Sequence, residues 1–371
     1  MKHYLKYILT FLFIFSLAGV QPVMSQDGAE GHEAQAEEKE LNVKELILDH
    51  LADAYEWHLT TIGETHVSIP LPIIVIGEES GLNVFMSSKF HHGHEAYKGF
   101  YIAQSGDHRG KIVEKNAAGE EIRPWDFSLT KIAVSLIISS ILLIIIVMSV
   151  AGWYKKQAKS GEHKAPKGFV GFMEMFVMSV QDDIIKPCVG KNYKKFSPYL
   201  LTVFFFIFFN NIMGLIPIFP GGATVTGNIS VTLILALFTF VIVNFFGTRE
   251  YWREVFWPDV PTWLKVPIPI MPAIELVGVF TKPFALMIRL FANILAGHSI
   301  VLGLTCLIFV TANMGPAISG SMTFVSVLLN VFISLVEILV AYIQAYVFTM
   351  LSAVFIGLAQ IEPHHHKAEE H

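Results

Sequence analysis

The sequence of 371 residues has few cysteines and none of the local motifs of common membrane enzymes. Its two cysteines, Cys188 and Cys306, stand in or beside apolar segments, so a disulfide framework and redox chemistry are not indicated. The apolar segments lack a nucleophile elbow, a His-Glu-x-x-His sequence, a phosphate-binding loop and a paired-aspartate motif, which argues against an intramembrane hydrolase. No internal repeat is present, which argues against a secondary transporter built from inverted repeats.

Apolar residues dominate the composition. Hydrophobic side chains make up 53% of the chain, and the mean hydropathy is +0.54. Both values indicate a protein that resides in lipid rather than a soluble enzyme. The net charge of −5 is uneven, because residues 27–131 carry 19 acidic and 9 basic side chains, a net charge of −10.

The first 26 residues have the pattern of a secretory signal peptide. Lys2, His3 and Lys6 precede an apolar run over residues 7–20, and small residues follow before an acidic stretch. The alternative is an uncleaved anchor helix. Either one places the next hundred residues outside the cytoplasm.

Residues 27–130 are predicted to form an acidic extension outside the membrane. Residues 27–40 are low in apolar side chains and are expected to be disordered, whereas residues 41–57 have the apolar spacing of a short amphipathic helix. Between residues 58 and 122, short apolar runs broken by glycine and proline predict the strands of a small β-rich module. The runs cover residues 67–76, 82–85 and 99–102.

This module is rich in histidine. Its histidines are His58, His66, His91, His92, His94 and His108. Imidazoles close together suit zinc or copper, but no cysteine and no fixed-spacing motif accompanies them. Solvated surface histidines are therefore the preferred interpretation, and we predict no metal site.

Five later segments have the length and composition of membrane spans. They cover residues 132–153, 198–217 and 229–247 and the two arms of a C-terminal hairpin, which starts near Pro272, turns at Gly315-Pro316 and has its second arm over residues 321–358. That arm is about 57 Å long as a helix, against a hydrocarbon core of about 30 Å, so it must be steeply tilted. Residues 169–185 have the spacing of an amphipathic helix lying along the interface. In the second span, Asn210 and Asn211 either bond between helices or line a cavity.

Charge gives the orientation of these segments. Lys155, Lys156 and Lys159, with two further lysines, follow the first span and are opposed only by Glu162. By the positive-inside rule this loop is cytoplasmic, in agreement with an external N-terminus. The predicted fold class is thus an all-α polytopic membrane protein of about five spanning helices plus one interfacial amphipathic helix, with a long tilted C-terminal hairpin and a small β-rich extramembrane N-terminal module. Its predicted parts are the signal peptide 1–26, the acidic periplasmic extension 27–130, the membrane domain 131–361 and a cytoplasmic tail 362–371.

An arginine lies deep in the first arm of the hairpin. Arg289 has apolar residues on both sides, and a central arginine costs about 2.5–3.5 kcal/mol on insertion scales. Snorkelling to a headgroup is the alternative, but no interface is close in sequence. Glu275, Lys282 and Arg289 are spaced 7 and 7, and Asn293 follows by 4, so all four share one helical face.

The second arm has Glu337 as its only charge, with Gln344 seven residues later on the same face. In an antiparallel hairpin that turns near residue 316, Arg289 lies level with Gln344. By the same counting, His298 lies level with Glu337, about 13 Å further along the helix.

These polar positions resemble subunit a of the F-type (F0F1) ATP synthases. The resemblance covers roughly residues 125–361 and rests on the Arg289-Leu-Phe-Ala-Asn293 core, the preceding Lys282-Pro283, Glu275, and Glu337 seven residues before Gln344. Two features depart from the bacterial pattern. Many bacterial members have the acid and the imidazole of His298 and Glu337 exchanged, and a glycine is common where Ala292 stands. The exchange keeps one acid and one imidazole at the same depth, so we interpret it as preserving the function.

The resemblance implies a non-catalytic stator subunit that conducts protons through two offset half-channels. Arg289 would separate the half-channels and attract carboxylates of the c-subunit ring; His298 and Glu337 would relay protons from the periplasm, and Glu275 would lie in the cytoplasmic half-channel. Asn293 and Gln344 would orient water or Arg289, and Lys282 would either line the channel or snorkel. The implied partners are the c-ring, the b-subunit peripheral stalk, the rest of the ATP synthase, the lipid bilayer and protons, with no cofactor and no nucleic acid. The expected location is a bacterial inner membrane, with the N-terminus periplasmic after signal cleavage and the C-terminus cytoplasmic.

Overall fold

The computed structural model describes residues 52–360, apart from 63–64, 79, 94, 105, 107, 116–119, 162–164, 217–218 and 258–269. The predicted signal peptide, residues 27–51 and the C-terminal tail lie outside the described residues. The chain divides into two compact units. The first comprises Met1–Ile138, Met213–Val225 and Ser299–Ser334, and the second comprises Ser139–Ile212, Thr226–His298 and Leu335–His371.

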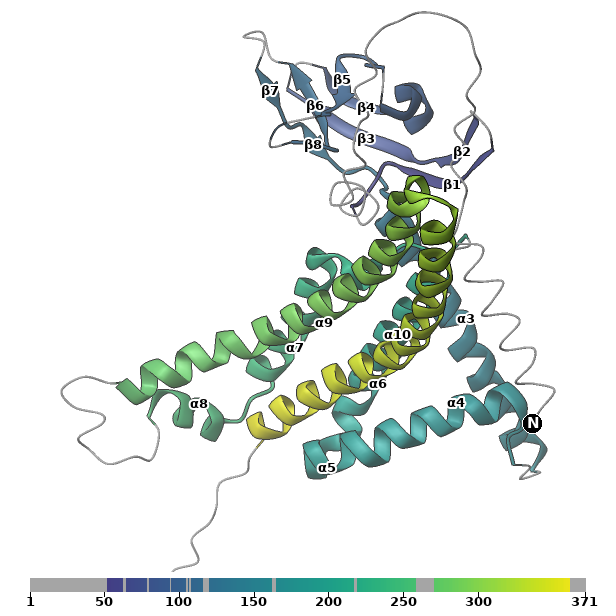
Figure 1. Ribbon diagram of the computed structural model, residues 1–371. Coiled ribbons are helices and arrows are strands. Elements are labelled where there is room, and N and C mark those ends of the chain that lie inside the picture. The colour runs from purple at the N-terminus through teal and green to yellow at the C-terminus, as the bar shows by residue number, and fades with distance from the viewer. Residues whose placement is uncertain are drawn as a thin grey trace, which may run out of the picture. The chain divides into compact units, whose positions relative to one another are not determined.

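The first unit contains the predicted β-rich module, which consists of three small antiparallel sheets (Figure 1). The two-stranded sheet pairs β1 (Glu56–Ile62) with β2 (Thr65–Pro70). The other two have the strand orders β4-β3-β8 and β5-β6-β7. Their strands are β3 (Pro72–Gly77), β4 (Gly81–Met86), β5 (Phe100–Ile102), β6 (Ile112–Lys115), β7 (Glu121–Ile122) and β8 (Trp125–Asp126).

The start of this module corrects the prediction of a helix over residues 41–57. The residues of that range that the structure describes, 52–57, are not helical, and β1 begins at Glu56. The reason is that the burial pattern here repeats every two residues, as in a strand, and not every three to four, as in a helix. Tyr55 and Trp57 are both buried at 4% exposure, and the less buried Glu56 lies between them. The predicted run 67–76 is also two strands, because Leu71 leaves the ladder and its N–H donates to Ser87 Oγ over 3.0 Å.

The module has its own apolar core, formed by Tyr55, Ile73, Val75, Phe85, Phe90, Phe100 and Ile112. The Tyr55 hydroxyl donates a hydrogen bond to the Asp126 carboxylate. Burial, together with that carboxylate, raises the pKa of Tyr55 above its ordinary value. Because Asp126 is in β8, this bond fastens the last strand of the module to the segment that precedes β1.

The membrane domain is helical, as predicted. Its helices are α3 (Lys131–Ser160), α4 (Gly168–Ser179), α5 (Lys186–Val189), α6 (Tyr193–Leu215), α7 (Ile229–Phe245), α8 (Arg249–Phe256), α9 (Ile270–Thr311) and α10 (Pro316–Ala359). In the described part of the chain, four helical stretches are long and apolar enough to cross a membrane, namely α3, the run from α4 to α6, α9 and α10. The pair α7 and α8, bent by 101°, makes a fifth. The number agrees with the five spans that the sequence predicts.

The predicted amphipathic segment 169–185 is α4 followed by a π-helical stretch, Val180–Ile185. Met173, Val180 and Ile184 are buried, as the spacing predicts, but Phe169 and Phe172 are half exposed. Gly190, at φ +72°, lies in the break that separates this segment from α6. A single continuous helix from α4 to α6 is therefore interrupted where the left-handed conformation favours glycine.

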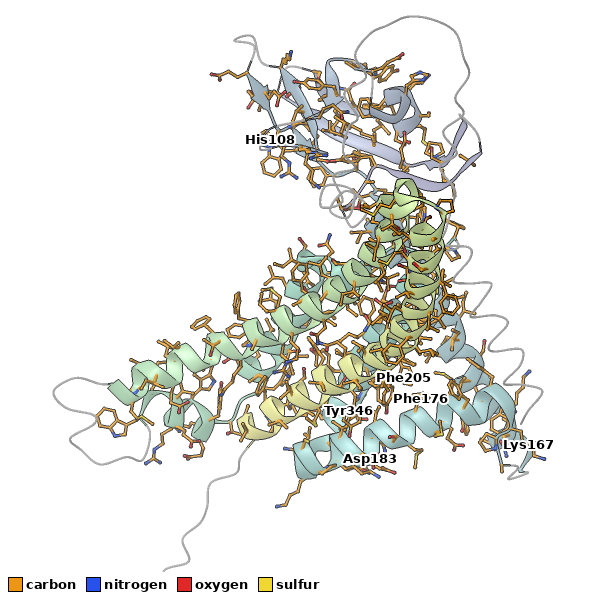
Figure 2. The ribbon with its side chains drawn as sticks, viewed as in Figure 1. His108, Lys167, Phe176, Asp183, Phe205 and Tyr346 are labelled. Atoms are coloured by element: carbon orange, nitrogen blue, oxygen red, sulfur yellow. The ribbon has the colours of Figure 1, made fainter. Side chains whose placement is uncertain are left out.

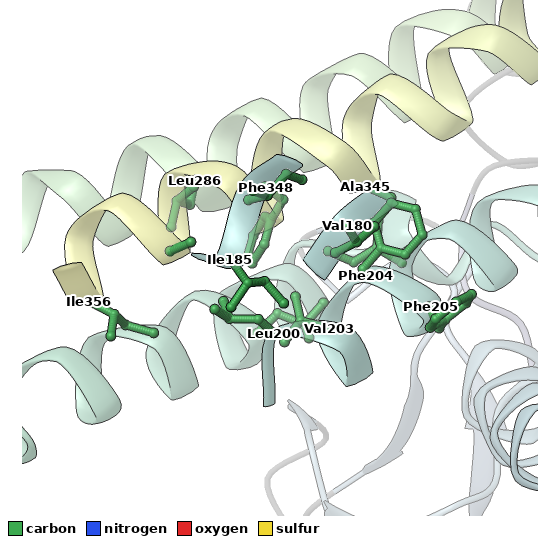
Figure 3. Close-up of a cluster of buried hydrophobic side chains, with 14 of the residues drawn as sticks. Val180, Ile185, Leu200, Val203, Phe204, Phe205, Leu286, Ala345, Phe348 and Ile356 are labelled. Carbon is green, nitrogen blue, oxygen red and sulfur yellow. The ribbon is translucent and has the colours of Figure 1, made fainter. Parts of the chain in front are cut away.

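A large apolar cluster in the second unit joins these helices to the hairpin (Figure 3). The cluster includes Ile185 of the π-helical stretch, Leu200 of α6, Leu286 of α9, and Phe348 and Ile356 of α10. All five are at most 1% exposed. Phe176 and Tyr346 pack against the same cluster, whereas Asp183 is exposed (Figure 2). This packing fixes which faces of α9 and α10 remain available to a functional site.

The C-terminal hairpin has the turn and the length that the sequence predicts. Gly315, at φ +98°, ends a short 3₁₀ turn, and α10 starts at Pro316. The helices contain 42 and 44 residues, or about 63 and 66 Å, which is roughly twice the hydrocarbon thickness of a bilayer.

Candidate functional site

The acid and the imidazole of the hairpin lie together, at equal depth. His298 Nδ1 is 3.5 Å from Glu337 Oε1, and the side chains are only 16% and 12% exposed. This confirms the pairing that the turn position predicts. An imidazole beside a carboxylate can accept a proton on one nitrogen and release one from the other, which is the chemistry of a relay.

A second polar pair lies closer to Arg289. Asn293 Nδ2 donates to Gln344 Oε1 over 2.7 Å, and Gln344 is 3% exposed. The sequence predicts Gln344 at the level of Arg289. The Gln344 amide instead accepts a hydrogen bond from Asn293, which lies one helical turn beyond Arg289 on α9. The physical reason is that side chains tilt toward the N-terminus of their own helix, so in an antiparallel pair two residues offset by one turn reach toward each other.

The Gln344 amide is not fully satisfied within the described residues. Its Nε2 is buried and has no hydrogen-bond partner there. A buried donor without a partner costs about 1–3 kcal/mol. Both N–H groups of this amide are therefore available to hold a water molecule or another polar group at this depth.

Arg289 lies on the exposed side of α9. Its neighbours Leu286 and Leu290 are buried at 1% and 0% exposure, and they anchor that turn of the helix. Within the described part of the chain, Arg289 makes no hydrogen bond and no ion pair with another side chain. It lines an open groove together with Thr281, Lys282, Ala285, Leu286, Leu351 and Phe355. The arrangement offers an uncompensated guanidinium at an apolar surface, which suits a carboxylate on a partner.

Lys282 lies in the same groove as Arg289, and its ammonium is 5.9 Å from the centre of the Phe355 ring. It also lines a neighbouring cavity with Asn244 and Tyr251. Glu275 does not line either space, but it interacts electrostatically with Tyr251. Of the two residues predicted on the N-terminal side of Arg289, Lys282 therefore lines both spaces and Glu275 lines neither.

Two features of the hairpin escape the sequence analysis. Gly297 faces Glu337 so closely that a Cβ on it would lie 2.6 Å from Oε1. Farther toward the turn, Asn330 Nδ2 donates to Thr305 Oγ1 over 3.2 Å. Asn330 lies seven positions from Glu337 and Thr305 lies seven from His298, so the same-face spacing used for Gln344 could have found this second pair.

The asparagines of α6 form hydrogen bonds within the second unit, which is one of the two expected roles. Ser139 Oγ donates to Asn210 Oδ1 over 2.7 Å. Asn211 Nδ2 donates to the carbonyl of Ala341 over 3.2 Å and so ties α6 to α10. This bond holds α10 one turn from Glu337 and one turn from Gln344.

The histidines of the module do not form a described metal cluster. His91 lies 3.6 Å from Glu95, and His108 stands in the turn before β6 (Figure 2). Among the residues the structure describes, no group of three His, Cys, Asp or Glu could hold a metal ion. The side chains of His58, His66, His92 and His94 lie outside the described residues.

Comparison with known proteins gives the family. The family model described as ATP synthase A chain matches residues 134–357. The chain belongs to the ATP synthase subunit a family. A subunit a 2 of Chlorobaculum tepidum is 43% identical over 259 residues, which cover 67% of this chain and 68% of the relative. A subunit a of Chloroherpeton thalassium is 41% identical over 253 residues, covering 66% and 70%.

Another member of the subunit a family matches the chain over a longer range. The subunit a of Anaeromyxobacter sp. is 34% identical over 354 residues, covering 94% of this chain and 77% of the relative. A separate family model, described as a domain of unknown function (DUF8433), matches residues 46–127. The β-rich module is therefore a recognisable domain joined to the subunit a fold.

Proposed function

We propose that this chain is the stator proton channel of an ATP synthase, with two offset half-channels that Arg289 separates. The observation that carries the proposal is the arrangement on α9 and α10. A relay pair, His298 and Glu337, and an amide pair, Asn293 and Gln344, lie on one side of Arg289 along the helix. Arg289 itself stands without a described partner at an exposed groove.

The periplasmic half-channel would end at the relay pair. A proton that reaches Glu337 could pass to His298, because Glu337 Oε1 and His298 Nδ1 are 3.5 Å apart and a small side-chain rotation would bring them within hydrogen-bond distance. From His298, Asn293 is five residues, or about 7.5 Å, nearer to Arg289. The unpartnered amide nitrogen of Gln344 would hold water on that path.

Arg289 would act as the barrier and as the electrostatic partner of the rotor. A guanidinium does not lose its proton in a protein, so it cannot conduct a proton across its position. A cation within about 4–6 Å lowers the pKa of a carboxylate by roughly 1–3 units. A ring carboxylate that passes Arg289 would therefore release its proton, and each proton that crosses 100 mV supplies about 2.3 kcal/mol for rotation.

The cytoplasmic half-channel would lie on the other side of Arg289. Lys282 shares the groove of Arg289, seven residues or about 10 Å along the helix. Glu275 is 14 residues or about 21 Å from Arg289 along α9. The two polar sets would thus lie on opposite sides of Arg289 along α9, and the guanidinium between them would interrupt a continuous proton path.

The same proposal covers orientation and partners. The first unit gathers the N-terminal end of α3, the α6–α7 connection and the α9–α10 turn, which the sequence places on the periplasmic side. The C-terminus is then cytoplasmic. The chain would be a multi-pass, non-catalytic subunit of a bacterial inner membrane that works with the c-ring, the b-subunit stalk and the rest of the synthase.

The test is ATP-driven proton pumping in membrane vesicles that carry the whole complex. Glu337→Ala and His298→Ala are each expected to lose most pumping, whereas the exchange of His298→Glu with Glu337→His keeps one acid and one imidazole at the same depth and retains part of it. ATP hydrolysis in the same membranes controls for assembly. An exchange variant no better than the single variants would contradict the relay.

A further inference from the structure

The sheet β4-β3-β8 of the module is apolar on both faces. One face packs into the core through Ile73, Val75 and Phe85. The other face is exposed: Leu82 and Val84 are 66% and 60% exposed. The sheet therefore has a second apolar surface that no described residue covers.

Cross-strand pairs make this surface continuous. Val84 of β4 pairs with Ile74 of β3, and Leu82 pairs with Ile76. On its other edge, Ile76 pairs with Trp125 of β8, which is 74% exposed. An antiparallel sheet with one solvated face normally carries polar residues there, and a contiguous exposed apolar patch marks an interaction surface.

Hydrogen bonds fix this sheet to the start of the first membrane span. The N–H of Phe127 donates to the carbonyl of Ile74 over 2.9 Å, and that of Leu129 donates to Pro72 over 3.1 Å. These bonds continue the pairing of β3 beyond β8, as far as two residues before α3. The ladder thus leaves no free linker between the sheet and the helix.

A second set of bonds holds the first turn of α3 itself. The N–H of Lys131 donates to the carbonyl of Ala54 over 2.8 Å, and that of Ile132 donates to Asp53 Oδ1 over 3.1 Å. Both acceptors belong to the segment before β1. The N-terminal end of the span is therefore part of the module's hydrogen-bonded framework.

The composition of α3 shows where the bilayer begins. Residues 132–152 are uncharged and span about 31 Å as a helix, which matches a hydrocarbon core of about 30 Å. The hydrocarbon boundary therefore falls near Ile132. Phe127, which is 60% exposed, precedes it by five residues, at most about 17 Å of extended chain. Tryptophan is enriched at that level of a membrane protein, and Trp125 precedes Phe127 by two residues.

We propose that the apolar face formed by Ile74, Ile76, Leu82, Val84, Met86 and Trp125 lies on the lipid surface at the N-terminal end of α3. The same unit contains the first two turns of α3, where Ile137 is 45% exposed. Apolar side chains of a surface-bound element insert about 5–10 Å into the headgroup and acyl boundary. The module would then rest on the membrane surface, which is a role that the proton path does not require.

The experiment is site-directed spin labelling of the full chain within the assembled complex, in vesicles of phosphatidylcholine and phosphatidylglycerol. In a background with Cys188→Ala and Cys306→Ala, a nitroxide is attached to Val84→Cys, with Leu82→Cys as the second site on the face. Lys115→Cys, an exposed residue of the sheet β5-β6-β7, is the matched control. All three positions are exposed in strands, so labelling does not disturb a core.

Collision with molecular oxygen, which concentrates in lipid, is compared with collision with a water-soluble nickel chelate. The expected result is an oxygen-to-nickel ratio several-fold higher at positions 84 and 82 than at position 115. Equal ratios at all three would overturn the proposal, because the face would then be in water. Protection of positions 84 and 82 from both reagents would also overturn it, because another protein would then cover the face.

Discussion

Gly297 offers a sharp test of how Glu337 is positioned. In Gly297→Ala, the new Cβ would lie 2.6 Å from Glu337 Oε1, whereas ordinary contacts begin near 3.4 Å. The carboxylate must therefore retreat by about 0.8 Å. Glu337 Oε1 also faces His298 Nδ1, at 3.5 Å. A shift of the carboxylate by about 0.8 Å would therefore change the distance and the angle between the acid and the imidazole.

The expected consequence is a loss of transport with little loss of fold. Alanine in a helix interior is favoured over glycine by about 1 kcal/mol, and the clashing atom is the end of a flexible side chain. A misplacement of about 1 Å at a reacting group costs up to about 100-fold in rate. We expect ATP-driven pumping to fall at least about tenfold on that scale, while ATP hydrolysis continues to report an assembled complex.

Gly320→Ala is the matched control, because it makes the same change in α10 where a Cβ meets nothing within 4 Å. A rescue variant combines Gly297→Ala with Glu337→Asp, which withdraws the carboxylate by one methylene, or about 1.5 Å. We expect the combination to pump better than Gly297→Ala alone. Pumping by Gly297→Ala at the level of Gly320→Ala would refute the claim that Glu337 must sit at this position.

Two further predictions concern stability. Asn293→Leu removes the donor to Gln344 and leaves a buried amide unsatisfied, so the free energy of unfolding should fall by about 1–3 kcal/mol. Adding Gln344→Leu should recover part of the lost stability. Equal losses of stability in the single and double variants, measured by thermal unfolding, would contradict this prediction. The pKa of Tyr55 is raised by burial and by Asp126, so the stability that its protonated form gives is present below about pH 10 and is lost as the pH rises toward the folded-state pKa. Circular dichroism should therefore show the melting temperature of the module falling more steeply above about pH 10 in the wild type than in Tyr55→Phe, and parallel curves would rule this out.

The depth of the polar residues could be predicted from the sequence because the hairpin is simple. A single turn at Gly315 and two uninterrupted helices convert residue numbers into heights, so the pairing of His298 with Glu337 follows from counting. The contact of Gln344 with Asn293 does not follow, since it depends on the direction in which side chains leave a helix. The close approach of Gly297 depends in addition on the rotamer of Glu337, which no pattern of residue types encodes.

The module was harder to predict than the membrane domain. A 20-residue apolar stretch has few structural solutions in lipid, so α3 and α7 were recognisable from composition alone. The strands β7 and β8 have two residues each, too short for an alternating pattern to register. At Tyr55 and Trp57 the apolar residues fit either a helix or a strand, and burial of both by the rest of the module decides for the strand.

The most direct test of the account is the passive proton permeability and ATP-driven pumping of vesicles carrying Arg289→Ala, beside Arg253→Ala. Arg253 is an exposed arginine of α8 that pairs with Glu250 at 3.7 Å, so its loss controls for removing one guanidinium. The account predicts that Arg289→Ala abolishes pumping and lets protons leak, whereas Arg253→Ala behaves as the wild type. Continued pumping by Arg289→Ala would show that this arginine does not separate two half-channels.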